Sequence, residues 1–178
     1  MSSKLVVDTL EDNSTTYSLA LGSGNSSLPG TLDLSSGGVY LGGSGSANLL
    51  DDYEEGEYSV TVTPETSGTI SLYSTSDRFS YTKIGRMVHV NGWVQVLSNS
   101  SAVGNYVQIN LPFTIADLTD VAGRVGGAQV VTDASSPNTF NVYGAYGGEG
   151  GAILYLYIDA STLATGDDII IDFNYNAA

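Results

Sequence analysis

The stretch Arg86–Leu97, RMVHVNGWVQVL, alternates between two series of side chains along its whole length. The first series is aliphatic apart from one glycine, and the second mixes polar and apolar groups: Val88, Val90, Gly92, Val94 and Val96 against Met87, His89, Asn91, Trp93, Gln95 and Leu97. Residues two positions apart share one face of a β-strand. The stretch therefore predicts a long strand whose aliphatic face is directed at a hydrophobic core.

Similar runs of period two lie on both sides of this stretch. They are Tyr58–Thr63, Thr69–Ser74, Arg78–Ile84, Asn105–Leu111, Ala128–Thr132, Thr139–Gly144, Gly151–Asp159 and Asp168–Tyr175. No segment keeps apolar residues at helical spacing, although Thr114–Val121 has room for one helical turn. About nine strands separated by Gly, Asn and Asp turns predict an all-β fold, an antiparallel β-sandwich of the jelly-roll-like kind.

The composition divides the chain into an extended N-terminal arm, residues 1–50, and the β-sandwich, residues 51–178. In the arm, two apolar residues followed by a Gly/Ser turn recur from Leu19, Leu32 and Val39. So few apolar groups do not offset the conformational entropy that the arm would lose on ordering alone. We therefore expect the arm to attach to another chain through its apolar residues Leu5, Val6, Val7, Leu32 and Leu34. A flexible Gly/Ser linker is the alternative.

The formal net charge is −14, from 19 acidic and five basic residues. Such a surface repels nucleic-acid phosphates and anionic lipid headgroups, so we expect neither nucleic acid nor membrane as a partner. The sequence contains no cysteine, which excludes disulfides and thiolate metal sites. Its start, MSSKLVVDTL, has an apolar run of three residues, and we expect no secretory signal there.

The run Gly151–Asp159 is apolar on both faces, because Ile153, Tyr155 and Tyr157 alternate with Leu154, Leu156 and Ile158. A sandwich buries one face of each strand, so a second apolar face needs another contact. We expect a subunit interface that includes Met87, His89, Trp93, Tyr155 and Tyr157. Loops or the N-terminal arm folding over this face are the alternative.

Catalytic chemistry has little support in the sequence. His89 is the only histidine, and it lies within a predicted strand, whereas catalytic histidines more often lie on loops. With 19 acidic residues, some pair has glycosidase-like spacing by chance, so the number of acids carries no weight. We expect no enzyme activity, no catalytic residues and no cofactor.

Calcium is a further alternative at the acidic segment 51–57, whose carboxylates are Asp51, Asp52, Glu54, Glu55 and Glu57. Calcium takes oxygen ligands, but the segment has no D-x-D-x-D-G loop. An acidic run of this kind is usually a solvated turn, and we expect no metal site.

Two tyrosines lie in a glycine-rich stretch, NVYGAYGGEGG, over residues 141–151. Exposed aromatic rings stack on the apolar faces of sugars while neighbouring polar groups bind hydroxyls. Tyr143 and Tyr146 are therefore candidate glycan contacts. The alternative is a flexible hairpin loop whose tyrosines cover the end of the sandwich.

The segments LLDDYEEGEYSVTVTP (49–64), RFSYTKIGRMVHVNGWVQV (78–96) and INLPFT (109–114) together resemble a module of bacteriophage tail-fibre and virion-appendage proteins, as in phages of cyanobacteria and other aquatic bacteria. The opening KLVVDTLED, residues 4–12, is similar to the start of such proteins. Tyr58 stands where the module carries a tryptophan. The resemblance implies a jelly-roll-like C-terminal domain, usually a homotrimer, on the outside of a virion assembled in the host cytoplasm.

The short chain and the arm favour a trimeric head decoration or cement protein, whose partners are its own copies and other virion proteins. A short tail fibre or receptor-binding tip that contacts host surface glycans is the first alternative. A stand-alone carbohydrate-binding domain is the second.

Overall fold

We analysed a computed structural model that describes residues 39–40, 49–50, 52–122, 125–133 and 136–178. The expected attachment residues of the arm, Leu5, Val6, Val7, Leu32 and Leu34, lie outside the described residues. Within residues 1–50 the structure describes two short strands, β1 (Val39–Tyr40) and β2 (Leu49–Leu50), which pair antiparallel. We refer to residues 52–178 as the body.

Ten strands of the described body form one antiparallel sheet, which confirms the expectation of an all-β fold. The strands are β3 (Tyr53–Ser59), β4 (Val62–Pro64), β5 (Ser67–Leu72), β6 (Arg78–Ile84), β7 (Met87–Val103), β8 (Val107–Asn110), β9 (Val125–Asp133), β10 (Ser136–Gly147), β11 (Ile153–Leu156) and β12 (Asp168–Asn176). Their spatial order is β3-β6-β7-β12-β9-β10-β11-β8-β4, and β5 pairs with β7. Helical structure in the described residues is limited to two 3₁₀ turns, η2 (Thr119–Val121) and η3 (Ala160–Thr162).

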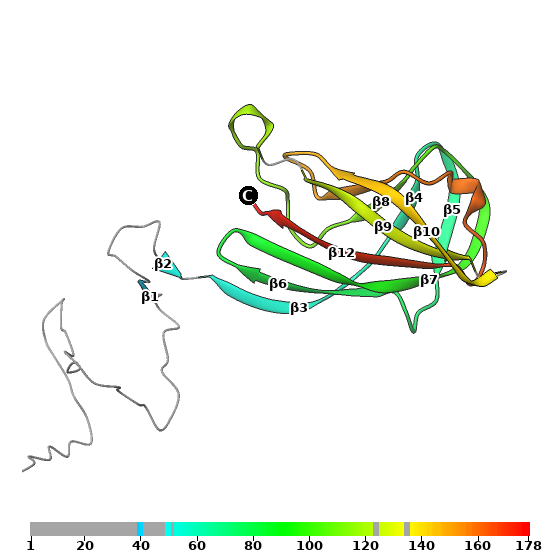
Figure 1. Cartoon of the computed structure of the whole chain (residues 1–178), viewed down its shortest axis with the longest axis horizontal. Helices are drawn as coiled ribbons and strands as arrows, with labels where there is room; N and C mark the ends of the chain where they lie inside the picture. The colour runs from blue at the N-terminus through cyan, green and yellow to red at the C-terminus, as the bar shows by residue number, and fades with distance from the viewer. Residues whose placement is uncertain (1–38, 41–48, 51, 123–124, 134–135) are drawn as a thin grey trace, which may run out of the picture. The chain divides into compact units, whose positions relative to one another are not determined.

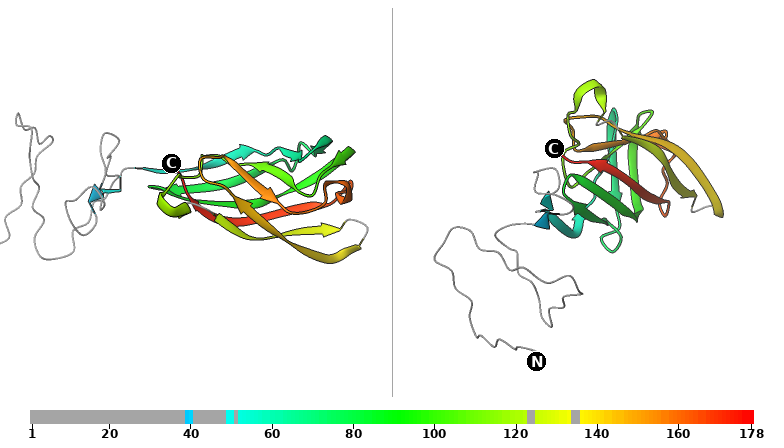
Figure 2. Two further views of the ribbon diagram at one scale, coloured as in Figure 1. Left: turned by 90° about the horizontal axis from the view of Figure 1, so that it is seen from above. Right: turned by 60° about the vertical axis from the view of Figure 1, so that its left-hand side comes forward.

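The sheet curls because β7, at 17 residues, is longer than any single partner. Its first part pairs with β6 and β12, and its last part pairs with β5, which lies next to β4. As a result, β4 at one end of the strand order lies near β7 through β5, and the sheet encloses one interior. In Figure 1, β3, β6, β7 and β12 run along the lower side of the body and β4, β5, β8 and β10 along the upper side, and Figure 2 shows the same strands from two further directions.

The hydrophobic core of the described body lies inside this curl. The aliphatic series of β7 is fully buried, with Val88, Val90, Val94 and Val96 all 0 % exposed. Side chains of β8, β11 and β12 meet it from the other strands: Val107, Ile109, Leu154, Leu156, Ile169 and Ile171. The alternation in the sequence therefore assigned the inward face of β7 correctly.

Residues 53–57 of the acidic segment lie in strand β3, so the expectation of a solvated turn was wrong for them. Residues of β3 pair with β6 along its whole length, from Tyr53↔Ile84 to Ser59↔Arg78. The buried ammonium group of Lys83 on β6 contacts the Asp52 carboxylate and lies 3.6 Å from Glu54 Oε1. The hydrogen bond with Asp52 raises the pKa of Lys83. Its contacts with Asp52 and Glu54 add to the backbone pairing between β3 and β6.

The predicted strand Tyr58–Thr63 is divided in the structure, because β3 ends at Ser59 and β4 begins at Val62. β4 closes the strand order on the far side, where it pairs with β8 alone. Pro64 fits this position, since an edge strand tolerates a residue that lacks a backbone N–H.

A polar side chain fixes the corner where β7 leaves its first partners. Asn99 Nδ2 donates to the carbonyl oxygens of Ala160 and Leu163, both at 2.8 Å, and its Oδ1 accepts from the Ala102 N–H at 2.9 Å. η3 is thereby tied to the bulged end of β7.

An aromatic hydroxyl fixes the opposite end of the interior. Tyr175 donates to the Phe113 carbonyl oxygen at 3.1 Å and accepts from the Phe113 N–H at 3.2 Å. Burial raises the pKa of Tyr175 to about 12, which keeps the phenol protonated and able to donate.

No helix in the described residues is long and apolar enough to cross a membrane.

Candidate functional site

Four tyrosines gather on the outward side of β8, β10 and β11, and we call them the tyrosine face: Tyr106, Tyr146, Tyr155 and Tyr157. Because Leu154 and Leu156 point into the core, the alternating residues of β11 point outward. The ring centroid of Tyr106 lies 5.3 Å from that of Tyr155 and 5.7 Å from that of Tyr157. Tyr146 stacks on Tyr155 at 6.2 Å.

Polar groups border the tyrosine face. In the strand register Tyr155 stands opposite both Tyr146 and Gln108, and Gln108 stands opposite Thr63. Beside Tyr106, the Asn105 backbone N–H donates to Glu65 Oε2 at 2.7 Å. Aromatic rings bordered by amide, hydroxyl and carboxylate groups are suited to bind the apolar face and the hydroxyls of a saccharide.

An open position adjoins these rings. The Tyr157 N–H donates to the Gly144 carbonyl oxygen at 2.9 Å, and a Cβ added to Gly144 would meet nothing within 4 Å. The outward side of Gly144, next to Tyr157 in the sheet, is therefore open to solvent.

The expectation that Tyr143 and Tyr146 share a loop was wrong. Both lie in β10, and residues three positions apart in a strand point to opposite faces. Tyr143 packs against the core, whereas Tyr146 joins the tyrosine face. Sequence reasoning also missed Tyr106, although Val107 and Ile109 point inward and their alternation places Tyr106 outward.

The five residues expected at a subunit interface fall on two separate parts of the sheet. Met87, His89 and Trp93 lie on the outward side of β7, while Tyr155 and Tyr157 belong to the tyrosine face. Three strands, β12, β9 and β10, separate β7 from β11 in the described sheet. His89 is engaged by a neighbour, since its Nδ1 lies 3.0 Å from Asn174 Oδ1.

An exposed apolar row crosses three strands near the start of the body, and we call it the β3 row: Tyr53, Ile84 and Met87. These residues are opposite one another in the register of β3, β6 and β7. They are 60 %, 51 % and 58 % exposed. Three contiguous large apolar groups on one sheet face are suited to contact another protein surface.

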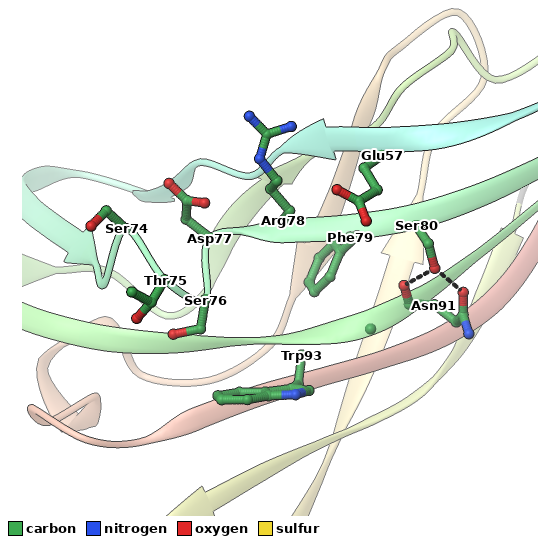
Figure 3. A pocket seen from close by; sticks show the side chains of 11 residues that line it. Glu57, Ser74, Thr75, Ser76, Asp77, Arg78, Phe79, Ser80, Asn91 and Trp93 are labelled. Atoms are coloured by element: carbon green, nitrogen blue, oxygen red, sulfur yellow. Dashed lines mark hydrogen bonds between the residues drawn. The ribbon is translucent and has the colours of Figure 1, made fainter.

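A pocket of about 360 Å³ opens between β6 and β7 beside Trp93. The other residues that line it are mostly polar: Glu57, Ser74, Thr75, Ser76, Asp77, Arg78, Phe79, Ser80, Asn91 and Gly92. Ser80 Oγ donates to Asn91 Oδ1 at 2.6 Å, as Figure 3 shows. The pocket thus combines two aromatic side chains, the exposed Trp93 and the buried Phe79, with several hydrogen-bonding groups.

Metal ligands do not converge in the described residues, among which no group of three His, Cys, Asp or Glu side chains could hold an ion. Asp51, one of the acids considered for calcium, lies outside the described residues. The described acids of β3 alternate between the two sides of the strand, so Glu55 and Glu57 point away from Glu54.

No family model matches the sequence, and no curated protein matches it. Among solved structures, the chain is similar to the crystal structure of the Dettilon tailspike protein, with a TM-score of 0.42 and 21 % sequence identity. The match covers 70 % of this chain and 24 % of the tailspike chain, so this chain spans about a quarter of that protein.

Proposed function

We propose that this protein is a surface protein of a bacteriophage particle and that its body binds saccharides of the host cell surface without catalysing their cleavage. The tyrosine face is the observation that carries this proposal, because four clustered aromatic rings bordered by polar groups suit sugars. The resemblance of residues 49–114 to virion-appendage proteins supports the location on a virion. The curled sheet is, in this proposal, a jelly-roll-like sandwich.

In this proposal the protein lies at the tip of a short tail fibre. A tip must expose its binding residues, and Tyr157 is among the exposed large apolar side chains of the body. Tyrosine suits this role better than an aliphatic residue, since its ring offers contact area and its hydroxyl remains hydrated.

Replacing Tyr157 with alanine is expected to weaken binding to host surface polysaccharide about tenfold, because one stacking surface of roughly 1.4 kcal/mol is lost. Tyr157→Phe is expected to keep most of the affinity. The measurement is isothermal titration with polysaccharide extracted from the strain that the phage infects.

The matched control is Tyr73→Ala, which removes a half-buried tyrosine outside the tyrosine face. Circular dichroism checks that each variant is folded. Equal affinities for Tyr157→Ala, Tyr73→Ala and the unchanged protein would contradict the proposed role of the tyrosine face.

A trimeric head decoration or cement protein is the second candidate, and the exposed β3 row favours it. Here the partner is a second copy of the chain, as in the trimers that the resemblance implies. Cryo-electron microscopy of the particle separates the candidates, since a cement protein covers the head in many copies and a tip lies at the tail. A stand-alone carbohydrate-binding domain would be missing from the particle.

The full chain is expected to have three times its 18.5 kDa mass in light scattering, and Ile84→Lys is expected to reduce this to one chain mass. A lysine in the β3 row would place an unpaired charge in an apolar contact, which is strongly unfavourable. Ser100→Lys, at an exposed position near the far end of β7, is the control. An unchanged protein that scatters as a monomer would refute the trimer.

A further inference from the structure

We propose that the pocket beside Trp93 is a second saccharide site, separate from the tyrosine face, and that it takes an uncharged sugar residue. The proposal goes beyond the tyrosine face, because it involves other residues on other strands. Its support comes from the break in the sheet at this place, from the side chains around the pocket and from their charge.

The pocket exists because β6 and β7 part from each other. Their register pairs end at Ser80↔Asn91, and the next hydrogen bond joins the Gln95 N–H to the Ser76 carbonyl oxygen at 3.1 Å. Gly92 lies in the interval with a φ of +144°. A volume of about 360 Å³ is at the small end of the range for ligand pockets and suits one or two sugar rings.

Trp93 supplies the apolar wall of the pocket. Its side chain is 50 % exposed, so one side of the indole remains open to solvent. In Figure 3 the indole lies on one side of β7, Asp77 and Glu57 lie across the opening, and the Arg78 guanidinium points away from Trp93. A ring that stacks on Trp93 can therefore direct its hydroxyls toward Asp77 and Glu57.

The charged groups of the pocket are available to a ligand. Within the part of the chain that the structure describes, the side chains of Glu57, Asp77 and Arg78 make no hydrogen bond or ion pair. Asn91 uses its Oδ1 to accept from Ser80, which leaves its amide N–H groups free to donate. Carboxylates that accept from hydroxyls, with a guanidinium and an amide that donate to oxygens, match the donors and acceptors of a sugar.

The charge of the site selects against acidic sugars. Two carboxylates face one guanidinium, and the whole chain carries −14. An acidic ligand would be repelled both locally and by the surrounding field.

The same groups argue against a subunit contact at Trp93. An interface that covered this pocket would desolvate Glu57, Asp77 and Arg78, and burying unpaired charges is costly. The β3 row has no such charges among its three members, so it suits a subunit contact better.

The test uses the fact that Trp93 is the only tryptophan of the chain. The full-length protein is titrated with glucose, galactose, N-acetylglucosamine and N-acetylgalactosamine while tryptophan emission is recorded. At least one of these sugars is expected to change the emission saturably in the millimolar range. Glucuronate, which adds a carboxylate to the glucose ring, is expected to bind at least tenfold more weakly than the neutral sugar.

Two variants assign the effect to the pocket. Asp77→Ala is expected to weaken the response about tenfold, while Asp117→Ala, an exposed acid elsewhere in the body, is expected to leave it unchanged. Tyr157→Ala is also expected to leave the Trp93 response unchanged, which separates this site from the tyrosine face. No saturable response to any of the four sugars, equal binding of glucuronate, or an unaltered Asp77→Ala response would overturn the proposal.

Discussion

Replacing Phe79 with alanine is expected to lower the free energy of unfolding by about 3–5 kcal/mol, the usual cost of deleting a fully buried aromatic ring. Phe79 is 1 % exposed and meets the Tyr58 ring edge-on, with centroids 6.1 Å apart. Its ring also fills the space beside Gly92, where an added Cβ would lie 2.9 Å from Phe79 Cδ1. Alanine would therefore leave a cavity between Tyr58 and Gly92.

Phe140→Ala is the matched control for this change. Phe140 is 65 % exposed on β10, so its removal is expected to change stability by no more than about 0.5 kcal/mol. Urea denaturation followed by circular dichroism gives both values. Similar losses for the two variants would show that Phe79 does not belong to the core as described.

The strand faces could be predicted from the sequence because alternation is a local property. Each valine of β7 is two residues from the next, and the pleat of a strand alone places them on one side. Which strands become neighbours is not local. β12 pairs with β7 through Ile170↔Trp93, two residues that are 77 positions apart in the sequence. The pattern of side chains in neither strand specifies that contact.

The errors at the candidate sites have a common physical origin. Glycines around Tyr143 and Tyr146 favoured a loop. In the structure Gly144 and Gly147 are strand residues of β10, and they pair with residues of β9 and β11. The carboxylates before Tyr58 favoured a turn, but β6 pairs with this segment and supplies Lys83 to contact Asp52 and Glu54. In both cases a partner distant in the sequence overrides the local preference.

The three surfaces of the body differ in what they are suited to contact. The β3 row is apolar, and the tyrosine face is aromatic with a polar border. The Trp93 pocket is aromatic with unpaired charges in its lining. Apolar groups alone favour a protein partner, whereas rings beside hydrogen-bonding groups favour sugars. The proposed surface protein, which would assemble through the β3 row and bind sugars at the other two surfaces, accounts for all three.

Replacing Gly68 with alanine is expected to lower the free energy of unfolding by about 4 kcal/mol, a loss similar to that expected for Phe79→Ala. Gly68 has a φ of +85°, which alone costs a residue with a side chain about 1 kcal/mol or more. It stands at a register shift where β5 crosses the bulged end of β7. An added Cβ would overlap the Ser101 carbonyl group and lie 2.6 Å from Ala102 Cα, and these are backbone atoms that cannot rotate away.

Gly150→Ala separates the two causes. Gly150 has a φ of +73°, but a Cβ added there would meet nothing within 4 Å. The Gly150→Ala variant is therefore expected to lose about 1 kcal/mol of its free energy of unfolding, from the backbone conformation alone. The difference between the two variants measures the cost of the steric overlap at Gly68. Because this overlap involves the end of β7 that pairs with β5, its relief requires β5 and β7 to move apart locally. Equal losses at the two positions in urea denaturation would mean that β5 and β7 do not approach each other this closely.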